Sequence, residues 1–386
     1  MPTTSNSKNI LKVPSGLSQD QEYFLSPMMI RKSMNNNLTN PPCRQSEAPF
    51  RLPPVQVSAY RVIGELVGLR PYRPGGFVVR PEVMNGKLVI HNYGHGGFGL
   101  GLSWGTSQLA IEEALKADSR ECAVLGCGAV GISTGILLQR HGFRVTIYAR
   151  DLPPNTTSNI AGGLWSPYFV CDEDSLTPSF NKQFQAAARH AHRHFRSMVG
   201  SEYGVRWVDS YFTADENVEV PRFLDDLPEL FPRVADFGPG QHPFPRRYAR
   251  RSGTMQIQTP TYMRAIERDF RTAGGHIVVR EFRNLQQILE LAEPTVINCT
   301  GLGSRDLFGD KELIPAKGQM TILLPQPKVK YILGIDGEAL YMIPRDDGIL
   351  LGGTFERDVW DLAPNPLEAE RILQGHSAFF EAMKER

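Results

Sequence analysis

The 386-residue chain contains no hydrophobic run of the ~18–20 residues that a membrane-spanning helix needs. It also has no excess of one charge, because 42 Lys and Arg residues against 41 Asp and Glu residues give a formal net charge of +1. A near-neutral chain offers no electrostatic reason to bind nucleic acid or an acidic membrane. The N-terminus lacks a basic region followed by an apolar stretch, and the C-terminal MKER is not a peroxisomal signal. We therefore expect a cytoplasmic protein whose partner is a small molecule.

Cysteine is scarce, and the five residues do not form CxxC pairs. This spacing argues against a disulfide framework and against a zinc site, so reduced thiols are expected. The triplet His190, His192 and His194 also gives no metal site. Only His190 and His194 share a helix face, and arginines lie between them, so we expect a solvated basic face.

The length predicts two domains, because single hydrophobic cores rarely grow beyond ~250–300 residues. Residues 1–57 are rich in Ser, Asn, Gln and Pro and show little periodicity. We interpret them as an irregular, dispensable lead-in rather than an active-site lid.

The stretch VLGCGAVGISTGILLQRHGFRVTIYARD has the signature of a dinucleotide-binding βαβ unit. Gly126, Gly128 and Gly131 lie between a short buried strand and a helix that ends near Gly142. The first permits the tight turn, the second the approach of the pyrophosphate, and the third close packing of helix on strand. Asp151 follows the second strand, where an acid can bind a ribose hydroxyl, although Arg150 occupies the more usual position. The motif alone does not separate NAD from FAD.

Elsewhere the patterns predict an apolar turn at YRVIGELVGL, strands at FVVR and KLVIHNYG, and a helix at SWGTSQLAIEEALKAD. Further helices are expected at FNKQFQAAARHAHRHFRSMV, TPTYMRAIERDFRTAGG and PLEAERILQGHSAFFEAMK, with a strand at PTVINCTG. ALYMIPRDDGILLGGTF predicts a hairpin that turns at residues 346–348.

Seven stretches together resemble one family of flavoenzymes. They are TTSNIAGGLWSPYF, VINCTG, PAKGQM, LYMIP, LGGTF, GLRPYRP and HNYGHGGFGL. The chain is similar to the D-amino acid oxidase and D-aspartate oxidase family, which uses FAD. The resemblance implies an α/β protein with a Rossmann-like FAD-binding domain, residues 88–169 and 255–310. It also implies a mixed β-sheet substrate domain, residues 58–87, 170–254 and 311–386.

The order of these stretches is unusual. In the family the glycine fingerprint comes first, and the counterparts of GLRPYRP and HNYGHGGFGL come last, whereas here the last pair comes first. We interpret this as a circular permutation, natural or engineered, with the family's original ends joined through residues 118–121. Permutation is tolerated where termini are exposed and close together.

By resemblance, three residues hold the substrate. Arg70 would bind its carboxylate through two parallel hydrogen bonds, and Tyr341 would support the same carboxylate. The carbonyl of Gly97 would accept a hydrogen bond from the substrate amine, and Tyr168 would line the pocket. Arg73 fits a structural ion pair better than a substrate contact.

The family also has a pocket tyrosine on a mobile lid, for which Gly337 stands here, so we expect no tyrosine lid. Gly101 stands where many relatives have a threonine beside the flavin, so that contact is not expected. The flavin contacts implied by the resemblance are Gly96, Gly97, Phe98, Gly99, Leu100, Gly101, Gly126, Gly128, Ala129, Val130, Gly131, Arg150, Asp151, Thr156, Thr157, Ser158, Gly162, Gly163 and Leu164.

The resemblance implies oxidative deamination of D-amino acids to 2-oxo acids, with release of ammonia and hydrogen peroxide; no acid–base pair and no metal are expected. GLRPYRPG resembles D-aspartate oxidases at least as well, whereas HNYGHGGFGL favours neutral substrates. A D-amino acid dehydrogenase with another electron acceptor, and a flavin-binding scaffold without turnover, stay open as alternatives. Family members are often dimers, so a homodimer is a further expectation.

Overall fold

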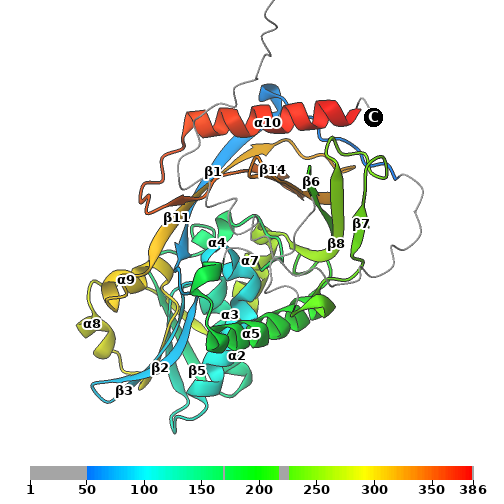
Figure 1. Ribbon diagram of the computed structural model, residues 1–386. Coiled ribbons are helices and arrows are strands. Elements are labelled where there is room, and N and C mark those ends of the chain that lie inside the picture. The colour runs from blue at the N-terminus through cyan, green and yellow to red at the C-terminus, as the bar shows by residue number, and fades with distance from the viewer. Residues whose placement is uncertain (1–49, 168–169, 217–225, 385–386) are drawn as a thin grey trace, which may run out of the picture.

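Two β-sheets form the framework of the molecule (Figure 1). The computed structural model describes residues 50–167, 170–216 and 226–384. The larger sheet has nine strands in the order β1-β11-β14-β13-β12-β6-β8-β7, with β15 paired to β11. Its strands are β1 (Val62–Tyr72), β6 (Val205–Ala214), β7 (Ala235–Phe237), β8 (Tyr248–Ile257), β11 (Ile314–Leu323), β12 (Tyr331–Ile335), β13 (Leu340–Arg345), β14 (Gly348–Gly352) and β15 (Glu356–Arg357).

The smaller sheet has six strands in the order β2-β3-β10-β4-β5-β9. They are β2 (Val78–Met84), β3 (Lys87–Tyr93), β4 (Glu121–Leu125), β5 (Arg144–Ala149), β9 (His276–Val279) and β10 (Thr295–Asn298). All neighbours pair in parallel except β2 with β3. Counted from β4, which leads into the glycine motif, the order β9-β5-β4-β10-β3 is 3-2-1-4-5, as in doubly wound folds. The fifth strand of that series, β3, nevertheless precedes the first along the chain.

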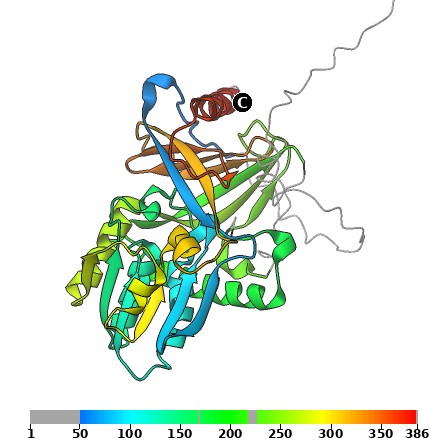
Figure 2. The same ribbon diagram turned by 90° about the vertical axis from the view of Figure 1, so that its left-hand side faces the viewer.

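The sequence expectation for the first strand of the larger sheet is wrong. The segment expected as an apolar turn, YRVIGELVGL, mostly forms β1, which pairs antiparallel with β11 from Val62 to Tyr72. Pro71 is tolerated near its end because β1 is an edge strand, which in the described part of the chain pairs with β11 alone. Figure 2 shows β1 and β11 running from the larger sheet toward the smaller one. The C-terminal end of β1, which carries Arg70, is thereby brought close to the smaller sheet.

Helices cover the smaller sheet and pack closely on one another. They include α2 (Gly99–Ala114), α3 (Ala129–Arg140), α5 (Pro178–Ser197) and α7 (Thr259–Thr272). A Cβ added to Gly105 of α2 would lie 1.8 Å from the carbonyl oxygen of Ala187 in α5, so the contact requires glycine. The side chain of Thr177 accepts a hydrogen bond from the Phe180 amide at 3.1 Å and caps α5, and Pro178 occupies the first turn. Among the described residues, no helix has the length and apolar character to cross a bilayer.

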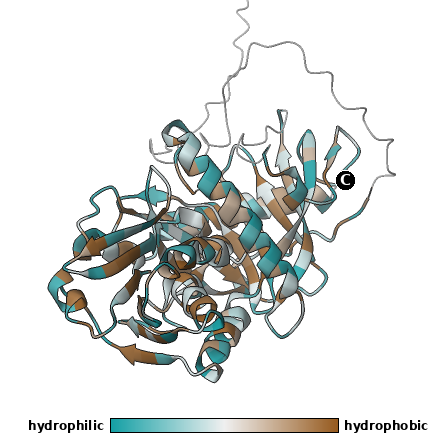
Figure 3. Ribbon diagram, turned by 90° about the horizontal axis from the view of Figure 1, so that it is seen from below, coloured by the Kyte–Doolittle hydropathy of each residue, from teal (hydrophilic) through white to brown (hydrophobic). Residues whose placement is uncertain are grey.

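The remaining helices are short, except for the last. They are α4 (Thr157–Ile160), α8 (Leu285–Leu289), α9 (Ser304–Leu307) and α10 (Pro366–Lys384). Helix α10 lies along the outer face of the larger sheet (Figure 1) and buries Ile372, Phe379, Phe380 and Met383 in the same core as strand residues such as Leu351. Figure 3 shows apolar colour on the inner strands and polar colour on most outer loops.

Two domain expectations differ from this arrangement. Strand β2 belongs to the smaller sheet, although residues 58–87 were assigned to the substrate domain, and α5 packs on α2 of the flavin half. The described part of the lead-in, residues 50–57, also differs from the dispensable segment that was expected. Residues 50–57 are irregular, as expected, but Val55 is only 1% exposed and Phe50 stacks on Tyr211 with ring centroids 5.5 Å apart. This segment is part of the core beneath α10 because its apolar residues have a face of the sheet on which to pack.

Candidate active site

A cavity of about 1310 Å³ lies between the two sheets and is lined by residues from both. Its volume exceeds the ~300–1,000 Å³ of ordinary ligand pockets, as expected for a site that holds both a cofactor and a substrate. Of the residues predicted to bind cofactor or substrate, all line this cavity except two. Ala129 is buried behind the glycine turn, and Tyr168 lies outside the described residues.

The glycine turn after β4 has the predicted constraints. Gly126 has a φ of +103°, and a Cβ there would lie 2.5 Å from the carbonyl oxygen of Cys299. A Cβ on Gly131 would lie 2.0 Å from the carbonyl oxygen of Gly126, so the first turn of α3 can pack on the loop only with glycine. The Ser158 hydroxyl accepts a hydrogen bond from the Ala129 amide at 2.9 Å, at the N-terminus of α3. Backbone donors and a hydroxyl thus meet where a phosphate is stabilised by a helix N-terminus.

The carboxyl ends of β5 and β9 form the far end of the cavity. Arg150 donates to its neighbour Asp151 at 2.9 Å, and its guanidinium also lies 3.8 Å from Glu281. The hydrogen bond and charge of Asp151 raise the pKa of Arg150 above its ordinary value. Glu281 belongs to a segment, residues 280–283, that lines the cavity but was not predicted. Its position directly after a parallel strand was the available signal, because ligands bind at the carboxyl ends of such strands.

The glycine-rich segment after β3 forms one wall of the cavity. Gly94 and Gly96 have φ values of +82° and +57°, and Gly97 is exposed. A Cβ on Gly101 would lie 2.1 Å from the ring of Phe98, so the ring fills the space that a larger residue would need. A threonine at position 101, as in many relatives, would therefore clash with Phe98 in this chain.

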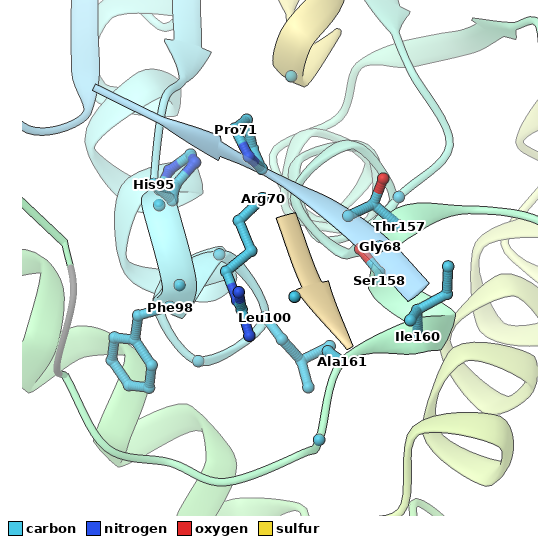
Figure 4. A pocket seen from close by; sticks show the side chains of 18 of the residues that line it. Gly68, Arg70, Pro71, His95, Phe98, Leu100, Thr157, Ser158, Ile160 and Ala161 are labelled. Carbon is cyan, nitrogen blue, oxygen red and sulfur yellow. The ribbon is translucent and has the colours of Figure 1, made fainter. Parts of the chain in front are cut away.

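In the substrate half, Arg70 and Tyr341 each lie over a glycine of a neighbouring strand. A Cβ on Gly318 would lie 2.2 Å from Nη1 of Arg70, and one on Gly352 would lie 2.1 Å from Cζ of Tyr341. Figure 4 shows Arg70 pointing from β1 into the pocket, toward the segment that carries Leu100. The two side chains therefore project from the sheet into the same cavity.

The charge of Arg70 has no counterion in the described part of the chain. Its hydrogen-bonding contact is with the Thr354 carbonyl at 3.4 Å, and its Cζ lies 5.7 Å from the centroid of the Phe355 ring. Among the described residues, the Tyr341 hydroxyl likewise makes no hydrogen bond. Arg73 contrasts with Arg70, as predicted, because it forms ion pairs with Asp310 at 2.8 Å and Glu312 at 2.6 Å. Of the two arginines in GLRPYRP, Arg70 is the one available to an anionic ligand.

Several residues that line the cavity were not predicted from the sequence. They include Phe212 and Arg250 from β6 and β8, Asp336 after β12, and Phe355 within LGGTF. Cys299 and Thr300, within VINCTG, also line the cavity but had no assigned contact. Alternation along a strand places every second residue on the cavity face, but only the strand order reveals which residues meet.

The histidine triplet corrects another expectation. His192 is buried against Trp165, with ring centroids 4.9 Å apart, and His194 stacks on Trp104 at 3.7 Å. Burial lowers the pKa of both histidines to about 4. These two residues are packing elements between α5 and the core rather than part of a solvated face. In the described ranges, no three His, Cys, Asp or Glu side chains are arranged to hold a metal ion.

Comparison with known proteins gives similarities over about two thirds of the chain. A family model described as FAD dependent oxidoreductase matches residues 121–386. A D-amino-acid oxidase from Dictyostelium discoideum is 30% identical over 258 residues, which cover 65% of this chain and 70% of that protein. A D-aspartate oxidase from Homo sapiens is 29% identical over 262 residues, which cover 66% of this chain and 74% of that protein.

Two solved structures share the fold. Glycine oxidase from Bacillus cereus ATCC 14579 has a TM-score of 0.52 at 17% identity, covering 69% of this chain and 79% of its own. L-proline dehydrogenase from P. horikoshii has a TM-score of 0.52 at 17% identity, covering 69% of this chain and 78% of its own.

Proposed function

Because the chain belongs to the family of FAD-dependent oxidoreductases, we propose that it oxidises D-amino acids to 2-oxo acids, with release of ammonia and hydrogen peroxide. Its action on amino acids follows from its relatives, which include the D-amino-acid oxidase and the D-aspartate oxidase described above. The choice of substrate enantiomer, the products and the use of oxygen are the proposed part.

The cavity suits FAD. The turn Gly126–Gly131, the hydroxyls of residues 156–158 and the backbone of residues 96–100, which line the cavity, would hold its pyrophosphate and ring system. FAD supplies the two-electron oxidation of the substrate α-carbon when it is bound. The protein's part is therefore to bind the substrate and to orient it.

The single observation that carries the proposal is the uncompensated charge of Arg70 in the cavity that also contains the glycine cradle. A guanidinium can bind an α-carboxylate through two parallel hydrogen bonds, which fixes direction as well as position. The Tyr341 hydroxyl would donate a third hydrogen bond to the same carboxylate. The exposed Gly97 carbonyl would accept one from the substrate amine, and together these contacts would hold the α-carbon in one orientation.

D-aspartate oxidation is the second candidate, because one relative is a D-aspartate oxidase. That reaction favours a second cation facing the substrate side chain. Arg250 lines the cavity but forms two hydrogen bonds with Asp236, at 2.6 Å and 2.9 Å. Because this charge is already paired, neutral D-amino acids are the better proposal.

Anaerobic spectroscopy of the purified flavoprotein tests the proposal. We expect D-methionine or D-alanine, but not their L-enantiomers, to bleach the flavin absorbance, and air to restore it with formation of peroxide. Bleaching by D-aspartate alone would favour the second candidate. Slow recovery in air without peroxide would indicate a dehydrogenase, and no bleaching by any D-amino acid would overturn the proposed function.

We also propose that the chain is a circular permutant of its family. The family model starts at residue 121, close to β4, and the strand that is fifth in the sheet series precedes β4 in the chain. The apolar side chains of residues 50–57 and of the last turns of α10, including Val55 and Met383, share one core. These observations support an origin in which a connection between α10 and β1 was opened and the ends near residues 117–121 were joined.

A further inference from the structure

The substrate half of the cavity contains a carboxylate with an unpartnered oxygen. Asp336 follows β12, lines the cavity and is partly exposed; its Oδ1 is buried and has no hydrogen-bond partner among the described residues. Its amide donates to the Thr213 carbonyl at 2.9 Å, which continues the pairing of β12 with β6 by one residue. Residues two apart on a strand face the same side, and the amide pairing with Thr213 continues the strand geometry by one residue, so we expect the Asp336 side chain on the face of Gly334 and Ile332.

The position of Asp336 relative to Tyr341 follows from the strand register. Tyr341 pairs with Gly334, and Asp336 lies two residues further along, about 7 Å by strand geometry. The ring of Phe212 lies over Gly334, where an added Cβ would be 2.9 Å from Cδ2. An apolar surface therefore lies between the proposed carboxylate-binding end of the site and the Asp336 carboxylate.

The neighbouring charges do not neutralise Asp336. Asp215 and Glu216 are close enough to raise its pKa, while Arg246 lowers it, and burial raises it most. Arg246 forms an ion pair with Glu338, lies 3.6 Å from Asp215 and stacks over the Phe379 ring at 5.6 Å, on the α10 side of the sheet. Among the described residues, no Lys, Arg or His side chain forms an ion pair with Asp336, and Arg246 is already paired with acidic side chains.

We infer that Asp336 selects D-amino acids with a cationic side chain, such as D-lysine and D-arginine, over acidic ones. This inference rests on the proposed function. The methylene stem of such a substrate would contact Phe212, and its ammonium or guanidinium group would meet the Asp336 carboxylate. An acidic side chain in the same place would be repelled by like charge.

The test compares D-lysine with D-norleucine, which has the same chain length without the charge. We expect the ratio of their kcat/KM values to fall tenfold or more in Asp336→Asn, because a charge-assisted hydrogen bond is lost. The ratio of D-glutamate to D-glutamine should rise in the same variant. Glu338→Gln is the matched control, because it removes a charge two residues away that does not line the cavity, and both ratios should stay unchanged.

The outcomes are distinguishable. If the enzyme oxidises D-norleucine and Asp336→Asn leaves the ratio of kcat/KM for D-lysine to that for D-norleucine unchanged, the inference is overturned and the proposed function is preserved. Failure of all D-amino acids to reduce the flavin would overturn both. If Asp336→Asn does not retain FAD, the wild-type enzyme decides, because a preference for D-glutamate over D-glutamine contradicts the inference and the reverse preference supports it.

Discussion

The guanidinium of Arg70 occupies the space above Gly318, on the next strand of the sheet, where a Cβ would lie 2.2 Å from Nη1. Arg70 itself pairs in register with Ala316, so it reaches along β11 by one strand repeat to cover the glycine. The missing side chain at Gly318 therefore allows the arginine to lie flat against the sheet and to present its donors to the cavity.

Replacing Gly318 by alanine should displace Arg70. We expect kcat/KM for D-amino acids to fall roughly 10- to 100-fold, mainly through KM, as in Arg70→Ala, because charge-assisted hydrogen bonds contribute about 1.5–3 kcal/mol each. FAD content should not change. Gly64→Ala, on the same strand pair with no atom within 4 Å of the new Cβ, is the control. Normal kinetics in Gly318→Ala would show that the position of Arg70 does not matter.

Gly131→Ala should affect the cofactor rather than the substrate. The new Cβ would lie 2.0 Å from the Gly126 carbonyl oxygen and would force α3 away from the glycine turn. We expect FAD occupancy, measured by the ratio of absorbance at 450 nm to that at 280 nm, to fall at least tenfold (roughly 1.4 kcal/mol or more in affinity). Arg140→Ala, at the other end of the same helix and outside the cavity lining, should retain FAD. Full occupancy in Gly131→Ala would contradict the proposed phosphate site.

Buried histidines should make folding stability depend on pH. Burial lowers the pKa of His95 to about 3 and that of His192, His194 and His376 to about 4, below the ~6.5 of an unfolded chain. Between these values the unfolded chain binds more protons, so stability is complete above about pH 6.5 and is lost as the pH falls toward 4. Urea unfolding at pH 7.5, 6 and 5 measures the effect.

His194→Phe isolates one of these groups, because a phenyl ring can keep the stack on Trp104 but does not titrate. We expect the slope of stability against pH to become shallower by up to about 1.4 kcal/mol per pH unit. The exposed His276, changed to glutamine, is the control. An identical slope in wild type and His194→Phe would show that His194 does not contribute.

Removal of residues 1–57 should destabilise the fold. The deletion would expose the core around Val55 and would remove the hydrogen bond from the Tyr331 hydroxyl to the Pro53 carbonyl, 3.0 Å long. The segment contributes one buried apolar side chain, Val55, and three partly buried ones, Phe50, Leu52 and Val57, so its loss should cost at least about 2 kcal/mol. A chain that lacks only residues 1–49 is the control, because it keeps residues 50–57 and their contacts with the core. Equal stability of the two truncated chains would support the original expectation that the whole lead-in is dispensable.

A chain with the family's order tests the permutation. The gene would encode residues 121–384, a short flexible linker, and residues 50–117. We expect this rearranged chain to bind FAD and to oxidise the same substrates, since the contacts of the folded state are unchanged and loop closure changes stability by only a few kcal/mol. If the rearranged chain is insoluble and lacks FAD, this would argue against the proposal that the two chain orders give the same fold.

The glycine turn of the proposed cofactor site could be predicted because it depends on local backbone constraints. Gly126 and Gly131 are recognisable in sequence since a tight turn followed by a helix excludes other residues there, and the later strands and helices repeat simple hydrophobic periods. The different roles of Arg70 and Arg73 were also predicted, on family resemblance. The ion pairs of Arg73 agree with its predicted structural role.

The tertiary structure decided which strands face one another. Asp336 and Phe212 belong to no motif, and the segments that carry them are neighbours only because β12 pairs with β6. His192 and Val55 were misjudged because neighbouring polar residues suggested solvent, whereas burial depends on which surface a segment packs against. The sequence alone therefore determined the local conformation and the class of cofactor. The shape and charge of the substrate end depend on long-range strand order, which a local pattern does not specify.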